Sequence, residues 1–297
     1  MPDVSVPRVA AQWLGQPLML HGDKAAAMAI GFCERLTGST VNVLSLGGED
    51  VTAGQLSGRI DRYFDPHETY LEPAAGVALI EVEGVLIHKG AWIGQSSGET
   101  SYEALRASVV NVRNDASINA VVFEFDSPGG LVSGAYELAE DIHALSREKP
   151  TIAILTDEAC SAAYLLASAC GSIVIPKVGL AGSIGIIQVY MNMLKRAEKE
   201  GVDVTVFSAG EKKADHHPFK EPREGFFEDA QSEAVKLRDM FAETVAAYRS
   251  NLTSDAIIAM ESGTYRGQEA VDAGLADVVA DPVQAMTEFC AMYGTPS

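Results

Sequence analysis

Two short apolar segments, each followed by small residues and then by a helical pattern, constrain the fold more than any other feature of the sequence. VVFEF at 121–125 precedes DSPGG, and TIAIL at 151–155 precedes a stretch that ends in Ser161. Between them, apolar residues recur at helical spacing from Leu131 to Leu145, and a third apolar segment, IVIP, follows at 173–176. This order of strand, glycine loop, helix and strand predicts an α/β domain with buried strands.

The pattern continues on both sides of this region. GVALIEVEGVLI at 76–87 predicts a pair of strand segments with a glycine between them, and DVTVFS at 203–208 predicts a further strand. Residues 226–249 predict a long amphipathic helix, and Ser161 opens a shorter helical segment. Ser133 is a candidate N-cap for the helix that follows DSPGG.

A change of composition near residue 75 divides the chain into two regions. Residues 1–75 combine a helical stretch at 23–36 with a segment rich in Gly, Asp and Ser, and we expect an N-terminal helical arm or adaptor there. Residues 76–297 form the expected main domain.

Charge and cysteine content exclude several functions. A formal net charge of −19, without clustered Lys and Arg, argues against a nucleic-acid partner. The cysteines show neither CxxC spacing nor histidine pairing, so we expect no metal site, disulfide framework or cofactor. They are Cys33, Cys160, Cys170 and Cys290.

The distribution of apolar residues predicts a soluble, cytoplasmic protein. The N-terminal residues lack a basic flank followed by an apolar signal core. The most apolar windows, at 151–170 and 172–194, are interrupted by charged residues, glycine and proline, so no membrane anchor is expected.

The two loops place candidate catalytic groups at one edge of the predicted sheet. Parallel neighbouring strands end at the same edge, where ligands bind in open α/β sheets. Gly129 and Gly130 allow a substrate carbonyl to approach backbone N–H groups that stabilise developing negative charge. Ser161 would lie opposite them, and Ala162 and Ala163 leave room for a substrate backbone.

A serine hydroxyl is a weak nucleophile until a base removes its proton. No G-x-S-x-G motif surrounds Ser161, and none of the six histidines has an evident acidic partner in the sequence. On these residues alone, the simpler interpretation is that Ser161 caps a helix.

Four ordered motifs reverse that interpretation. DSPGG at 126–130, CSAAYLLAS at 160–168, AGSIGII at 181–187 and SAGEKKADHHPF at 208–219 resemble the signal peptide peptidase A family of Ser–Lys serine peptidases. Within it, the chain is most similar to the head (capsid) maturation proteases of tailed phages and prophages. The resemblance covers about residues 75–280 and extends more weakly to AAQWLGQPLMLHGDKAAAM near the N-terminus.

The resemblance implies a ClpP/crotonase-like fold of repeated β-β-α units. It implies Ser161 as the nucleophile and Lys213 as the general base, because Gly210, Lys213 and Pro218 match the family's lysine segment. Lys212 is the adjacent rival, and Ser183 is a candidate for orienting the lysine.

The DSPGG motif of this resemblance contains Gly129 and Gly130, the residues expected above to form the oxyanion site. Ala162 and Ala163 stand where many relatives carry Gly-Gly, which leaves the width of the substrate channel open.

A lysine base must be uncharged. From an ordinary pKa near 10.4, burial would have to lower its pKa by about 2 to 4, at a cost of about 3 to 5 kcal/mol. That requires a pocket from which water is nearly excluded, whereas a single subunit would leave the lysine loop exposed to water. We therefore expect a homo-oligomer, and the resemblance implies a ring.

The expected function is a serine endopeptidase that works through an acyl-enzyme. It would process scaffold or capsid proteins, its own chain among the candidates, in the host bacterial cytoplasm or within the phage prohead. The alternatives are a bacterial peptidase that degrades signal peptides, a crotonase-like acyl-CoA enzyme, and an inactive structural subunit.

Overall fold

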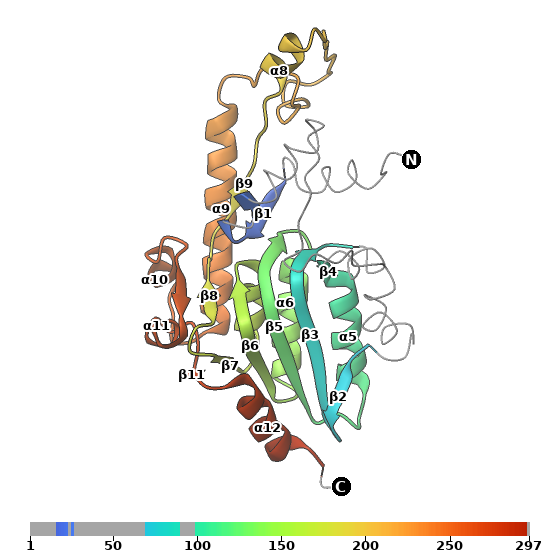
Figure 1. Cartoon of the computed structure of the whole chain (residues 1–297), viewed down its shortest axis with the longest axis vertical. Helices are drawn as coiled ribbons and strands as arrows, with labels where there is room; N and C mark the ends of the chain where they lie inside the picture. Colours follow the sequence, from blue (N-terminus) through green and yellow to red (C-terminus); the bar gives the residue numbers. More distant parts are fainter. Residues whose placement is uncertain (1–15, 23–24, 27–68, 90–98, 296–297) are drawn as a thin grey trace, which may run out of the picture.

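The computed structural model describes residues 16–22, 25–26, 69–89 and 99–295 (Figure 1). Most of the expected N-terminal arm at 1–75, with nearly all of the helical stretch at 23–36, lies outside these residues. The boundary at residue 75 stays a prediction.

Eleven strands of the described part join in one sheet. They are β1 Pro17–Leu20, β2 Leu71–Ala74, β3 Val77–Ile87, β4 Glu99–Ser101, β5 Ala120–Leu131, β6 Thr151–Cys160, β7 Ser172–Ile175, β8 Leu180–Gly182, β9 Ile187–Gln188, β10 Thr264–Arg266 and β11 Val278–Val279. The helices are α5 Tyr102–Asn114, α6 Ala135–Ser146, α7 Ala162–Ser168, α8 Leu194–Lys199, α9 Phe226–Tyr248, α10 Ser254–Ile258, α11 Gly267–Asp272 and α12 Pro282–Tyr293.

The centre of the sheet is parallel. β3, β5, β6, β7 and β11 pair in that order, and α5, α6 and α7 connect successive members from β3 to β7. Parallel pairing requires such crossover connections, which place helices against the faces of the sheet. The predicted α/β class is confirmed.

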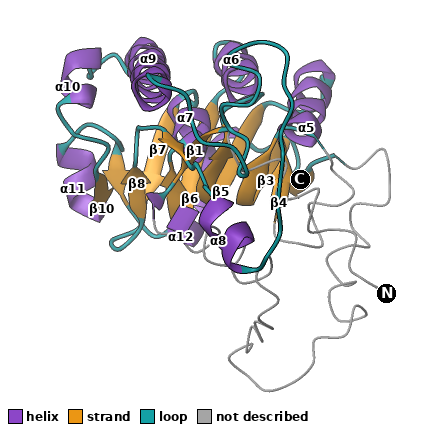
Figure 2. Cartoon of the chain, turned by 90° about the horizontal axis from the view of Figure 1, so that it is seen from above, coloured by secondary structure: helices purple, strands orange, loops and turns teal. Residues whose placement is uncertain are grey.

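Alternate residues of the central strands face two different layers. Phe123 and Phe125 of β5 belong to the large core formed with α5, α6, α7 and α9. Val122, the residue before Phe123, belongs to a smaller cluster with Phe289 of α12. Figure 2 shows α5, α6 and α9 along one face of the sheet and α12 on the other. Both faces are covered, so the strands read as continuous apolar runs.

The two predicted glycine and serine loops are strand instead. β5 continues through 126–130 to Leu131, and β6 continues through 157–160. In β5 the reason is pairing on both edges, since Gly129 and Gly130 lie beside β3 on one side and β1 on the other. In β6, residues 158–160 pair with β8. The expected pair of segments at 76–87 is likewise the single strand β3, whose pairing with β5 shifts register around Gly84.

Two further expectations were wrong and one is confirmed. Gly134, in a left-handed conformation, is the N-cap of α6, and the Ser133 hydroxyl hydrogen-bonds His88 Nδ1 at 2.8 Å instead. Residues 203–208 form no strand, because no described segment pairs with them. The long helix is confirmed as α9.

α9 packs on the sheet only through its second half. Phe241, Ala242 and Val245 are buried, whereas every residue from 227 to 240 is half-buried or exposed. Figure 1 shows the first half of α9 rising beyond the sheet together with α8. We call residues 189–240 the α8–α9 extension.

An ion pair between the buried Arg249 and the partly exposed Asp277 fastens the C-terminal elements to the sheet. Arg249, whose side chain is 6% exposed, donates to both carboxylate oxygens of Asp277 at 2.7 and 3.0 Å. Asp277 also accepts from the Ile173 N–H at 2.7 Å. Burial acts to raise the pKa of Asp277, but the hydrogen bonds from Arg249 and Ile173 outweigh it and the pKa is lowered.

Asp277→Asn should therefore destabilise the fold. The change leaves the buried Arg249 without its counter-charge, and we expect the free energy of unfolding in urea to fall by about 1 to 3 kcal/mol at pH 7. Because folding lowers the carboxyl pKa, the contribution is present above the ordinary value near 3.9 and is lost as pH falls through the folded value. The two proteins should thus converge at acidic pH. Asp203→Asn, at an exposed position, is the control, and equal stability of Asp277→Asn and wild type at pH 7 would contradict the assignment.

Candidate active site

Ser161 follows β6 directly, where the chain turns into α7. Its φ of 55° and ψ of −120° are uncommon for a residue with a side chain. Two contacts hold this turn: Cys160 pairs with Gly182 of β8, and the Ser161 N–H donates to the Gly182 carbonyl at 2.8 Å. The strained backbone is therefore maintained by its neighbours and aims the side chain in a fixed direction.

The Ser161 hydroxyl is buried and unpartnered. The residue is 0% exposed, and its Oγ has no hydrogen-bond partner among the described residues. It occupies the N-cap position of α7 without making a capping hydrogen bond, so the helix-cap interpretation is wrong. An unsatisfied buried hydroxyl costs about 1 to 3 kcal/mol. Such a cost is typical of a functional position.

The neighbouring thiol is not a rival nucleophile. Cys160 is fully buried, and burial, with the negative charge of Glu158, raises the pKa of its thiol to about 12. A thiol of this pKa carries almost no thiolate at neutral pH, and the thiolate is the reactive form.

The twin glycines allow a very close approach of backbones beside Ser161. A Cβ at Gly129 would overlap the Met19 carbonyl oxygen and lie 2.8 Å from the Cys160 oxygen and 3.0 Å from the Ala162 nitrogen. A Cβ at Gly130 would overlap the Leu86 backbone. The structure thus brings Gly129, Ser161 and Ala162 together, with Gly130 next to them.

Ser127 holds Gly129 in place through a hydrogen bond. Its buried hydroxyl donates to the Gly84 carbonyl at 2.6 Å and accepts the Gly129 N–H at 3.2 Å. Ser127 therefore joins β5 to β3 inside the sheet.

Ser183 lies near the same turn. It follows Gly182, the partner of the Ser161 N–H, and its own N–H donates to the Gly263 carbonyl at 2.9 Å. It is 8% exposed and also has a φ of 55°. In the described residues, no hydrogen bond joins Ser183 to Lys213, so its orienting role stays a prediction.

Lys213 does not reach Ser161 within one chain. It is exposed on the α8–α9 extension, and the unpartnered Ser161 Oγ receives no hydrogen bond from it. The rival Lys212 forms an ion pair at 2.9 Å with Asp229, in the first turn of α9. The single subunit therefore presents the predicted nucleophile and the predicted base on different parts of the molecule.

The backbone that carries Lys213 is nonetheless anchored. Asp215, two residues on, is 8% exposed and forms an ion pair at 2.9 Å with Arg223, which also contacts Asp229. Ala214 is buried as well. The Lys213 side chain thus projects from a fixed base.

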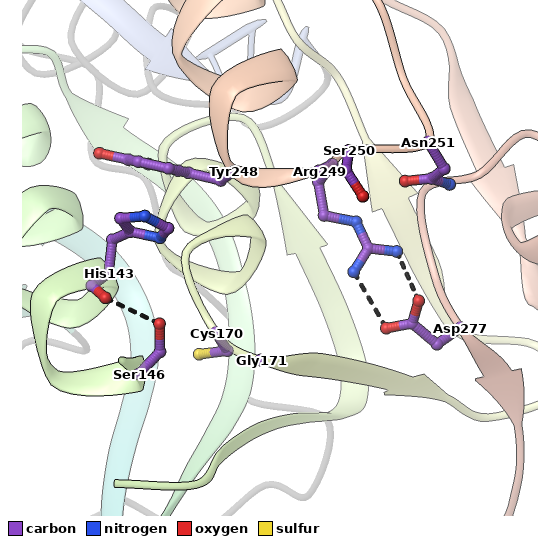
Figure 3. Close-up of a pocket in the computed structure, with 9 residues that line it drawn as sticks. All are labelled: His143, Ser146, Cys170, Gly171, Tyr248, Arg249, Ser250, Asn251 and Asp277. Carbon is purple, nitrogen blue, oxygen red and sulfur yellow. Dashed lines mark hydrogen bonds and ion pairs between the residues drawn. The ribbon is translucent and has the colours of Figure 1, made fainter. Parts of the chain in front are cut away.

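A cavity of about 400 Å³ lies elsewhere, where α9 ends beside α6 and the start of β7. Figure 3 shows Arg249 and Asp277 facing each other in it, with His143 stacked on Tyr248. None of the predicted catalytic residues lines this cavity, and none of them takes part in its ion pair.

The described residues hold no group of three metal-ligating side chains. In the same part of the chain, no helix is long and apolar enough to span a bilayer.

Ser161→Gly should stabilise the fold. Glycine adopts positive φ readily, and the change removes an unpaired hydroxyl, so the free energy of unfolding in urea should rise by about 1 kcal/mol. Ser161→Ala removes the hydroxyl but keeps the Cβ, so its free energy of unfolding should rise by less. If Ser161→Gly were no more stable than wild type, the backbone at this turn would not be strained.

Three relatives show what the chain is similar to. It is 30% identical over 290 residues to capsid assembly protease C of Escherichia phage lambda, covering 95% of this chain and 65% of that protein. It is 34% identical over 212 residues to head-tail preconnector protein GP5 of Enterobacteria phage P21, covering 71% and 42%. It is 28% identical over 209 residues to the chloroplastic serine protease SPPA of Arabidopsis thaliana, covering 69% and 29%. The chain spans less than two thirds of each relative.

The family match covers the site. Residues 143–291 match peptidase family S49, from α6 to α12. This segment contains Ser161, Ser183 and Lys213, while Gly129 and Gly130 precede it. With its strained serine between a parallel strand and a helix, and with this match over half of its length, the chain belongs to peptidase family S49 and has that family's ClpP-like α/β fold.

Proposed function

We propose that the protein is a serine endopeptidase with Ser161 as its nucleophile. The observation that carries the proposal is the buried, unpartnered Ser161 hydroxyl, held in a strained turn beside Gly129. Membership of a peptidase family supports the reaction class and disfavours the acyl-CoA chemistry and the inactive subunit considered above.

The reaction follows from these groups. The uncharged Lys213 amine takes the Ser161 proton as Oγ attacks the peptide carbonyl carbon, and the negative charge that forms on the carbonyl oxygen faces the backbone N–H groups of Gly129 and Gly130. The Gly129 N–H must turn from Ser127 to contribute. Protonated Lys213 then donates to the leaving amine, and water hydrolyses the acyl-enzyme with Lys213 again as base. Ala162 lines the substrate side.

The base must come from a second copy of the chain. Lys213 is exposed and forms no hydrogen bond with the Ser161 hydroxyl of its own chain. A neutral lysine requires a site from which water is excluded. The α8–α9 extension also exposes large apolar side chains, with Phe207 91% and Phe227 58% exposed. Packing of this extension on a neighbour in a homo-oligomeric ring would cover them and exclude water from the lysine.

The substrates are proteins of phage head assembly. The names of the lambda and P21 relatives support scaffold or capsid proteins as substrates, in the host bacterial cytoplasm or the prohead. The similarity to the chloroplastic serine protease SPPA, over a smaller share of its length, supports the second candidate, a bacterial peptidase that degrades signal peptides.

Ser161→Ala and Lys213→Ala should each abolish cleavage of a co-expressed head protein. Loss of nucleophile or base should lower the rate at least about 10³-fold, as seen by mass spectrometry of the fragments. Lys212→Ala is the matched control, because its amine already pairs with Asp229, and it should retain cleavage. Full cleavage by Ser161→Ala would reject the mechanism, and loss only in Lys212→Ala would move the base to Lys212.

Mixing the two inactive proteins tests the shared site. If Ser161 of one copy works with Lys213 of another, co-assembled Ser161→Ala and Lys213→Ala chains contain some intact pairs, and peptidase activity should return. Co-assembly of Ser161→Ala with Ser161→Gly should restore none. A mixture that stays inactive despite co-assembly, shown by pull-down of differently tagged chains, would place both residues in one chain.

A further inference from the structure

The edge of the sheet beside Ser161 already holds a strand of the same chain. β5 pairs with β6 as far as Ser127 and Ala159, after which β6 turns away into Ser161 and α7. From Gly129 to Leu131, β5 instead pairs with β1, which runs antiparallel to it. The other edge of β1 pairs antiparallel with β9. Figure 1 shows β1 between β9 and the end of β5.

The Met19 carbonyl of β1 lies beside Gly129, one of the two proposed oxyanion donors. Met19 pairs with Gly130, and its oxygen shares the space beside Gly129 with the Cys160 oxygen and the Ala162 nitrogen. Cys160 and Ala162 are the two neighbours of Ser161 in the chain. A substrate strand in this position would present its own carbonyl in the same way.

β1 lies in the slot between β5 and β9, and its side chains show which residues this slot accepts. Leu18, Met19 and Leu20 are 3%, 0% and 2% exposed, so the slot buries large apolar side chains on both faces of the strand. Gln16, just outside, is exposed. The His21 N–H extends the pairing with a 2.9 Å hydrogen bond to the Pro128 carbonyl.

Because the proposed nucleophile is buried, the position of β1 beside it affects the access of an external peptide. Ser161 is 0% exposed, so an external peptide reaches it only after a covering segment moves. β1 covers the edge of β5 on which an added strand would pair, and strand addition to an open edge is a common mode of peptide binding. Displacement of β1 opens that edge.

We propose that the slot between β5 and β9 is the peptide-binding groove, that it takes extended segments rich in large apolar residues, and that β1 occupies it as an internal competitor. The proposal rests on the peptidase function assigned to Ser161. An occupied slot lowers the apparent affinity for external peptide by the fraction of molecules in which it is open.

Displacing β1 from the full-length chain tests the proposal. Met19→Asp places a carboxylate in a buried apolar position, which disfavours the bound strand. Gln16→Asp adds the same charge at an exposed position and is the control. Both are made with Ser161→Ala, so that no cleavage occurs, and binding of a fluorescent peptide of sequence QPLMLHG is measured by anisotropy.

The Met19→Asp protein should bind the peptide at least tenfold more tightly than the Gln16→Asp protein. Equal affinity would overturn the proposal, because β1 would then be a permanent strand of the sheet. Should circular dichroism show that Met19→Asp is unfolded, Met19→Ser with Gln16→Ser as control gives the same two outcomes without a buried charge.

This readout separates the groove from the proposed function. Tight peptide binding by the displaced variant, with no cleavage by the wild-type catalytic residues, would keep the groove and reject proteolysis. Cleavage that persists while peptide affinity is insensitive to Met19 would keep proteolysis and reject the groove.

Discussion

The arrangement around Ser161 depends on the absence of two side chains. At Gly129 and Gly130, four backbone segments approach within contact distance: β3 at Leu86, β1 at Met19, and the turn from Cys160 to Ala162 against β5 itself. A single methyl group at either glycine would push these segments apart. Sheet pairing, the strained serine and the strand beside it are therefore one structural unit.

The two residues of the proposed catalytic pair differ in burial and in how they are held. Ser161 is built into the rigid centre of the sheet, where its turn is held by β8 and its hydroxyl is shielded from water. Lys213 stands on an anchored but exposed base at the far end of α9, which packs on the body only through its last turns. Rigidity at the nucleophile and exposure at the base fit a site that is completed by assembly.

Local sequence patterns predicted the parts of the fold that depend on local structure. The α/β class, α7 and α9 are confirmed because their apolar periodicity and helix formers agree with the final packing. DSPGG is composed of turn-forming residues, yet pairing with β1 and β3 makes it strand. Residues 203–208 alternate as a strand does, but no described neighbour pairs with them. The prominence of Ser161 came from family resemblance. The nearness of Met19 could not be predicted, since Met19 and Gly129 are more than a hundred positions apart. The strain at Ser161 could not be predicted either, since the turn is held by pairing with Gly182 of another strand.

The same long-range contacts determine when the site can exist during folding. The turn at Ser161 is held by Gly182, which adjoins Ser183 and its partner Gly263, and the parallel strands beneath it join only through helical crossovers. Native structure that depends on such distant pairings forms late, after most of the chain has been synthesised. A nascent or partly folded chain therefore lacks the geometry around Ser161, the proposed nucleophile.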